Sequence, residues 1–423
     1  MPLLSTSALN VCLRAAGLVF RFGLTVFIAR YLGVESLGVA SFLFAAVSVT
    51  PPLLSFGLHY RLNREIVGRP LEEAVSRLRD RLALHLLILA ALALVAGGGV
   101  AFGDFLPAGS QRLAAWIALF AFLIGSLELV AFELNHGLIS LKQSVLANAF
   151  LFFRSSSWVP LFVAVAYVFQ DMRSIPALLA FWMCGFVMAY TFLLHALRHW
   201  PWQAIITRPP DYPWLFRDFR KSFLIYCSDI AMVLALYADR VIIGGLLGIG
   251  EAGIYFFYWS LSAGIHQLIQ SSVTQPAAPE LVTCARSGDQ VLLESLRHHL
   301  RRSLVWSLVL GLGCALTVFL LVGHLGRPEI ASHFHLLPIL LVGTLFSARS
   351  DTLYLALYAK HRDVAVASSN FFGLGAALLF TTVGILAFGL VGAPIGMVAN
   401  AVCSCLFRTV LLKRALADGQ AAA

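Results

Sequence analysis

The stretch SLVWSLVLGLGCALTVFLLVGH, residues 303–324, contains no Asp, Glu, Lys or Arg and follows directly on Arg301 and Arg302. An α-helix needs about 20 mainly apolar residues to cross the ~30 Å hydrocarbon core of a bilayer, and this stretch meets that length. Runs of the same kind recur from one end of the chain to the other. A transmembrane β-barrel would instead show alternating segments of about ten residues. The sequence therefore predicts an all-α membrane protein.

The composition supports a chain that is largely embedded in lipid. Of 423 residues, 60% are apolar and only 12% are charged, whereas a soluble domain carries roughly 25% charged residues. The seven cysteines lie mostly inside apolar runs and form no CxxC pair. No Cys/His spacing fits a zinc site and no GxxxxGK[ST] loop occurs, so we expect no metal, no cofactor and no ATP hydrolysis.

Apolar runs and breakers predict about 12 transmembrane helices in two six-helix halves around a central cavity. The halves are residues 1–205 and 206–423, joined by the Pro/Trp-rich linker 199–220. The predicted spans are 8–30, 37–58, 81–103, 112–134, 146–169, 175–197, 221–246, 252–274, 303–324, 335–358, 364–387 and 389–412.

Basic residues alternate between the connections and predict the orientation. The even-numbered connections and the C-terminal tail carry 20 lysines and arginines, and the odd-numbered connections carry three, Arg112, Arg173 and Arg327. The positive-inside rule then places the even connections and both termini in the cytoplasm of a bacterial cell, with the chain in the inner membrane. The net charge of +9 accordingly reflects topology and attraction to anionic lipid, and nucleic acid is not implied.

The two halves contain a weak internal repeat. Residues 31–42, YLGVESLGVASF, align with residues 246–257, LLGIGEAGIYFF, at four identical positions and two Val/Ile pairs. Both segments form the first external turn of their half, which predicts a parallel repeat. Such repeats suit alternating access to a site near the bilayer midplane.

A family resemblance rests on three stretches that together span nearly the whole chain. The first stretch contains LRAAGL from residue 13, FIARYLG ending at Gly33, and Leu37-Gly38. The second contains ADRVIIGGLLG over 238–248, Gly253-Ile-Tyr255 and Pro279-Glu-Leu281. The third contains residues 356–362, Asn370-Phe-Phe-Gly373 and residues 388–396. The chain resembles the polysaccharide transporters of the multidrug/oligosaccharidyl-lipid/polysaccharide exporter superfamily.

The resemblance implies a flippase for polyprenyl-pyrophosphate-linked oligosaccharides, such as O-antigen units. It also implies a monomer that works in the lipid bilayer, and it allows association with other polysaccharide-assembly membrane proteins. It does not identify the glycan.

Arginines inside the predicted spans point to an anionic substrate, because a charge in the membrane is costly unless it is paired or faces water. Arg14 and Arg21 lie seven residues apart, within about 20° of one another on a helix, and Thr25 continues their stripe. The repeat aligns Thr25 with Arg240. We predict that Arg14, Arg21 and Arg240 line a cationic cavity for a pyrophosphate, which guanidinium groups can bind with two prongs. Arg154 and Arg349 are further candidates for substrate binding.

Carboxylates at similar depth leave two interpretations open. Glu128, Asp229 and Asp351 share a predicted layer with Arg14, Arg154 and Arg349, so they either pair with these arginines or take up a coupling proton or sodium ion. Asp239 is expected to orient or neutralise a neighbouring arginine. Glu133 and Arg408, nearer the cytoplasmic boundary, are expected to extend toward the headgroups.

Span eight carries one polar and aromatic stripe with steps of three or four residues. A glycan could bind along it through aromatic faces and hydrogen bonds, or the same groups could hydrogen-bond to neighbouring helices. The candidates for glycan binding are Tyr255, Trp259, His266 and Gln270, and Ser262 and Thr274 complete the stripe.

Other functions fit less well. A cation-coupled drug exporter of the same superfamily would favour an acidic cavity, whereas span one offers arginines. A polytopic glycan polymerase generally needs a sizeable external loop, and the external connections here are short. We therefore expect a transporter rather than an enzyme.

Overall fold

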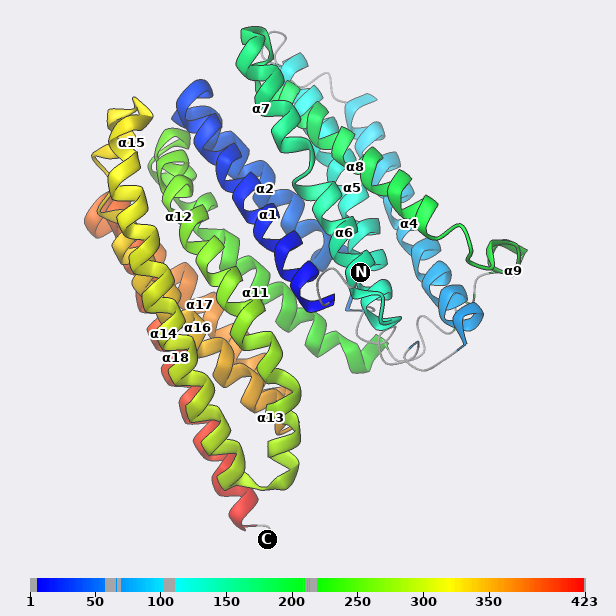
Figure 1. Cartoon of the computed structure of the whole chain (residues 1–423), viewed down its shortest axis with the longest axis vertical. Helices are drawn as coiled ribbons and strands as arrows, with labels where there is room; N and C mark the ends of the chain where they lie inside the picture. The colour runs from blue at the N-terminus through cyan, green and yellow to red at the C-terminus, as the bar shows by residue number, and fades with distance from the viewer. Residues whose placement is uncertain are drawn as a thin grey trace. The chain divides into compact units, whose positions relative to one another are not determined.

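The computed structural model describes most of the chain and is drawn in Figure 1. All regular secondary structure in the described part is helical, which confirms the predicted all-α class. Arg61, Arg64, Arg69, Arg208 and Arg217 of the basic connections lie outside the described residues, as do the last residues of predicted spans 37–58 and 81–103. The described residues are 6–57, 66, 70–101, 111–207, 209, 211, 213 and 219–421.

Each predicted span coincides with a long helix or, for span five, with two consecutive helices. In the first half these are α1 (Thr6–Phe27), α2 (Val34–Leu54), α4 (Leu71–Ala101), α5 (Gln111–Ser140), α6 (Ser144–Ser155) with α7 (Trp158–Val168), and α8 (Ile175–Ala196). In the second half they are α11 (Phe219–Leu246), α12 (Ile249–Ile269), α14 (Asp289–Val322), α16 (Leu336–Ala359), α17 (Asp363–Phe388) and α18 (Gly392–Ala421).

Shorter elements connect or extend these helices. The π-helices η1 (Ile28–Leu32) and η3 (Gln270–Thr274) continue α1 and α12. The remainder are η2 (Gln170–Met172), α9 (Trp202–Thr207), α13 (Gln275–Ser287), η4 (Gly323–Leu325), α15 (Pro328–Ala331) and η5 (Gly389–Val391).

Eight helical segments of the described residues are long and apolar enough to cross a membrane, and one of them runs through both α17 and α18. This protein is therefore a multi-pass membrane protein.

The helices group into two compact units. The first comprises Met1–Leu24 and Leu43–Tyr226, and the second comprises Thr25–Phe42 and Cys227–Ala423. The end of α1, η1 and the beginning of α2 thus belong with the second unit. The halves drawn from sequence, residues 1–205 and 206–423, remain a prediction.

A glycine crossing explains why the start of α2 joins the second unit. Gly33 and Gly248, which the repeat aligns, have φ/ψ of 93°/170° and 104°/169°, a conformation that favours glycine. If Gly38 carried a side chain, its Cβ would lie 2.1 Å from the Ile249 carbonyl oxygen. Reciprocally, a Cβ on Gly253 would lie 2.0 Å from the Val34 carbonyl oxygen. The repeat that was weak in sequence is therefore present as a pseudo-symmetric contact between α2 and α12.

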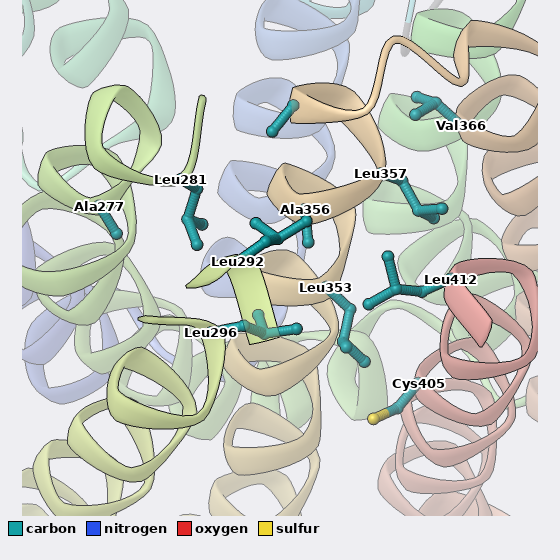
Figure 2. Close-up of a cluster of buried hydrophobic side chains, with 11 residues drawn as sticks. Ala277, Leu281, Leu292, Leu296, Leu353, Ala356, Leu357, Val366, Cys405 and Leu412 are labelled. Carbon is teal, nitrogen blue, oxygen red and sulfur yellow. The ribbon is translucent and has the colours of Figure 1, made fainter. Parts of the chain in front are cut away.

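Leucine-rich faces hold the second unit together at α13, α14, α16 and α18. Figure 2 shows Leu281, Leu292, Leu296, Leu353 and Leu412 gathered between these helices. Burying a leucine side chain contributes about 1.5–3 kcal/mol. This cluster therefore stabilises the packing of α16 and α18, which carry polar groups of the second unit.

Candidate functional site

Arg240 of α11 lies in an aromatic box in the second unit. The centre of its guanidinium is 3.7 Å from the ring centroid of Trp259, 4.7 Å from that of Tyr237 and 5.4 Å from that of Phe256. The residue is 1% exposed. Its Nε, Nη1 and Nη2 are buried and have no hydrogen-bond partner among the described residues. A permanent cation with five N–H donors is thus in contact with three ring faces, and its guanidinium makes no hydrogen bond to any described residue.

The Asp239 carboxylate makes no hydrogen bond to the guanidinium of Arg240, and its expected role in orienting or neutralising a neighbouring arginine stays a prediction. Its carboxylate accepts a hydrogen bond of 2.7 Å from the Tyr255 hydroxyl and another of 2.8 Å from the backbone N–H of Arg240. Adjacent residues on a helix point in different directions, and here the carboxylate joins α11 to α12. Tyr255 is fully buried in this arrangement.

The remaining stripe of span eight is used mainly for contacts between helices. The Ser262 hydroxyl lies within hydrogen-bond distance of the Thr344 hydroxyl on α16 and donates to the Leu340 carbonyl. Thr274 is buried. The hydrogen bonds of Tyr255 and Ser262 therefore favour the interhelical interpretation, while Trp259 is the stripe residue that covers Arg240.

His266 and Gln270 converge on Asp351 of α16. His266 Nε2 lies 2.9 Å from Asp351 Oδ2, and Gln270 Nε2 donates to the same oxygen at 2.8 Å. The side chains of His266 and Asp351 are 23% and 28% exposed. The protein therefore encloses the pair only in part.

Arg408 of α18 is the centre of this second cluster. It donates from Nη1 to the Ser350 hydroxyl at 3.0 Å and from Nη2 to Asn370 Oδ1 at 3.0 Å. Its Nη1 lies 3.7 Å from Asp351 Oδ1. Asn370 in turn donates to the Ser228 hydroxyl at 2.9 Å. Because Arg408 is only 8% exposed, the prediction that it extends toward the headgroups is wrong.

The second-unit arginine that meets Asp351 is therefore Arg408 and not Arg349, which the sequence had matched with it. Arg349 is exposed. Asp229 of α11 is buried, with 8% exposure. In the second unit, Asp351 of the predicted layer therefore meets a different arginine from the one expected.

In the first unit, one acid and one base of the predicted layer form a pair. Arg154 of α6 lies 2.6 Å from Glu128 of α5, measured between Nη1 and Oε1, and is 6% exposed. Arg14 of α1 donates from Nε to Asn148 Oδ1 at 3.3 Å. Arg21 is exposed. Arg14 and Arg21 belong to the first unit and Arg240 to the second, so their joint cavity stays a prediction.

A fully buried ionic cluster was missed by the sequence analysis. Arg81 of α4 meets Glu133 of α5 with two prongs, Nε to Oε2 at 2.6 Å and Nη2 to Oε1 at 2.6 Å. His85 Nε2 lies 3.7 Å from Glu133 Oε1, and all three side chains are 0% exposed. Glu133 therefore does not extend toward the headgroups, and Arg81 is not a free cytoplasmic charge.

No group of three or more His, Cys, Asp or Glu side chains in the described part of the chain could hold a metal ion. The candidate site is thus made of protein cations, carboxylates and aromatic rings.

The fold matches solved membrane transporters. An inward-facing multidrug resistance transporter of the MATE family superposes with a TM-score of 0.70 at 14% identity, over 97% of this chain and 98% of the other. The lipid II flippase MurJ, in an inward closed conformation, gives 0.73 at 13% identity, over 96% of this chain and 87% of the other. A MATE transporter of Vibrio cholerae, VcmN, gives 0.61 at 11% identity, over 98% and 96%.

No family model and no curated protein sequence matches this chain. At 11–14% identity the structural likeness establishes the fold, which this chain shares with drug exporters and a lipid flippase alike.

Proposed function

We propose that this chain is a flippase that moves a polyprenyl-pyrophosphate-linked oligosaccharide from the cytoplasmic to the outer leaflet of a bacterial inner membrane by alternating access. The observation that carries the proposal is the buried, unpartnered guanidinium of Arg240 in its aromatic box.

A buried charged group without a hydrogen-bond partner is costly, by about 1–3 kcal/mol or more. Cation–π contacts offset part of this, at roughly 2 kcal/mol for a desolvated pair. The N–H donors of Arg240 nevertheless stay unused. A phosphate would take two of them at once through paired, charge-assisted hydrogen bonds. Trp259, whose ring is nearest to the cation, is only partly buried, so a movement of this ring would open the donors to a ligand.

The acidic side chains favour an anionic substrate over a cationic drug. Glu128 is paired with Arg154, Asp239 with the Tyr255 hydroxyl, and Asp351 with His266 and Gln270. A cationic substrate would have to displace one of these partners before it could bind any of these three carboxylates. An anion that enters after the Trp259 ring has moved meets the unsatisfied donors of Arg240 without displacing an ion-pair partner.

Arg14 and Arg21 would add positive charge to the substrate path of the first unit, and exposed Arg21 is the more accessible of the two. The charge of the proposed substrate is also consistent with a buried cation, because the pyrophosphate between the polyprenyl chain and the glycan must cross the apolar interior of the bilayer. A buried cation lowers the cost of that passage for a dianion.

The discriminating experiment is a transport assay in proteoliposomes. One preparation receives a polyprenyl-pyrophosphate-linked oligosaccharide in one leaflet, and an impermeant lectin measures its appearance in the other. A second preparation is loaded with a cationic dye, and its efflux is measured under the same ion gradients. We expect lipid transfer without dye efflux. Dye efflux without lipid transfer would contradict the proposal and favour a drug exporter.

A further inference from the structure

We infer that His266 is a proton-binding site in the second unit, with Asp351 as its counter-charge, and that its protonation drives the transport cycle. The inference rests on the proposed transport function but concerns its energy source, which the fold and the arginines leave open.

The first support is the geometry of the pair. With its Nε2–H directed at Asp351 Oδ2 over 2.9 Å, a neutral His266 still has Nδ1 as a proton acceptor. Protonation at Nδ1 converts the neutral hydrogen bond into an ion pair with the same atoms. No bond other than the new N–H forms, and water supplies the proton through the exposed side of the imidazole.

The second support is the set of charged groups around the pair. On α16, Asp351 and Tyr354 face this region, and the Tyr354 ring lies 5.2 Å from the centre of the Arg408 guanidinium. α18 contributes Arg408, 3.7 Å from Asp351, and η3 contributes neutral Gln270. Asp229 on α11 acts electrostatically on Tyr354.

An apolar cluster lies on residues next to the pair in the sequence. Ile265 and Ile269 on the same face of the chain pack with Ala348 of α16 and Leu310 of α14. α17 presents the neutral side chains of Ser369 and Asn370, both of which interact with Arg408. His266 is the imidazole of this cluster, and imidazole is the side chain that proteins use most often as a proton shuttle.

The cluster fits a proton better than a metal cation. Sodium or calcium requires several oxygen ligands. Asp351 Oδ2 already receives two nitrogen donors, from His266 and Gln270, and Oδ1 faces the positive Arg408. A metal ion would have to displace at least two of these contacts. A proton displaces none.

The π-helix η3 supplies a reason for movement. It begins at Gln270, directly after α12, and π-helical turns recur at functional sites because their backbone ladder is less regular. A charged His266 attracts Asp351 more strongly and competes with Arg408 for it. The expected consequence is a tighter α12–α16 contact and a looser α16–α18 contact, with η3 as the segment that accommodates the change.

Two measurements test the inference. The first needs no substrate: NMR of the purified protein with labelled histidine, in which the His266 signal is identified by its loss in His266→Gln. We expect this signal to titrate between pH 5 and 9 and its midpoint to change in Asp351→Asn. A His266 signal that stays constant over this range would overturn the inference, whatever the substrate is.

The second is transfer of the lipid-linked oligosaccharide as a function of pH and of an imposed proton gradient. His266→Gln, which keeps a hydrogen-bond donor, should fold, retain substrate binding and lose at least tenfold of the gradient-driven rate. His324→Gln is the matched control, because that ring is exposed and its Nδ1 lies 3.1 Å from the Leu320 carbonyl oxygen of the preceding helix, α14. A wild-type pH profile in His266→Gln, or transfer driven by sodium alone, would refute proton coupling.

The two proposals fail in different ways. If His266 titrates and the lipid-linked oligosaccharide is never transferred, the proton site stands and the substrate assignment is wrong.

Discussion

The crossing of α2 and α12 gives a stability prediction whose size follows from the structure. The perturbation is Gly253→Ala. The added Cβ would lie 2.0 Å from the Val34 carbonyl oxygen and 2.8 Å from the Gly38 nitrogen, whereas ordinary contact begins at 3.4 Å. The neighbour is backbone and cannot rotate away, so the two helices must separate by about 1.4 Å at this point.

Overpacking of this kind costs about 1–3 kcal/mol. Replacing glycine by alanine inside a helix also contributes about 1 kcal/mol of helix propensity in the opposite direction. Gly264→Ala is the matched control, since it lies on the same helix and its Cβ would meet nothing within 4 Å. Because both variants share the propensity gain, the difference between their free energies of unfolding isolates the steric cost, about 1–3 kcal/mol.

Reversible denaturant unfolding in detergent measures this difference. Gly253→Ala should be less stable than Gly264→Ala by that amount. Gly38→Ala should be destabilised similarly, and the double variant by less than the sum, because one separation of the helices relieves both clashes. Equal stability of Gly253→Ala and Gly264→Ala would refute the close crossing.

Three further predictions follow from other contacts. Glu133→Gln should lower the free energy of unfolding by about 3–5 kcal/mol, since it leaves Arg81 buried and unpaired, and Arg81→Met in the same chain should restore much of this loss in thermal unfolding. Glu280, on α13 outside the spans, has its pKa lowered first by a hydrogen bond from the Ser295 hydroxyl. The hydrogen bond to Glu280 therefore stabilises the folded state fully above the ordinary carboxyl pKa, and this stabilisation is lost as the pH falls through the lowered pKa. Ser295→Ala should raise the pKa of Glu280 measured by NMR and reduce the loss of stability in acid. The predicted orientation can be tested with single cysteines in a cysteine-free background and an impermeant maleimide on intact cells. A cysteine at Gly326 should react and a cysteine at Arg286 should not, and the opposite result would contradict the predicted topology.

Helix positions could be predicted from the sequence because length and hydropathy alone set them. The predicted span 364–387 differs from α17, Asp363–Phe388, by one residue at each end. The repeat was also readable, since Gly33 and Gly248 mark the same turn. That Gly38 and Gly253 touch could not be read, because a sequence shows small residues without showing what approaches them.

The charged groups were predicted less well, for a physical reason. Depth along a helix was judged correctly for Glu128 and Arg154, which pair. Depth does not give the rotation of neighbouring helices, which decides that Asp351 meets Arg408 and His266 rather than Arg349. Glu133 was placed in the headgroup region because predicted span 112–134 ends next to it, whereas α5 continues to Ser140.

The sequence indicated two residues of the aromatic box around Arg240 but not the contact between them. Arg240 and Trp259 were both candidates for substrate binding, on separate arguments. Their 3.7 Å contact depends on the packing of α11 against α12, which no periodicity encodes. The box nevertheless makes the anion hypothesis sharper than it was, because it specifies which donors remain unused.

The central claim is that Arg240 binds the pyrophosphate of the substrate. Calorimetry in detergent can compare a polyprenyl pyrophosphate with the neutral polyprenol for the wild type, Arg240→Ala, Arg240→Lys and the control Arg302→Ala, whose residue is exposed in the middle part of α14. One hydrogen bond to a charged group contributes about 1.5–3 kcal/mol, so Arg240→Ala should weaken pyrophosphate binding by roughly 10- to 150-fold. Polyprenol binding should not change, Arg240→Lys should recover the loss only in part, and Arg302→Ala should bind as the wild type does. A folded Arg240→Ala protein that binds the pyrophosphate lipid with wild-type affinity would contradict the account.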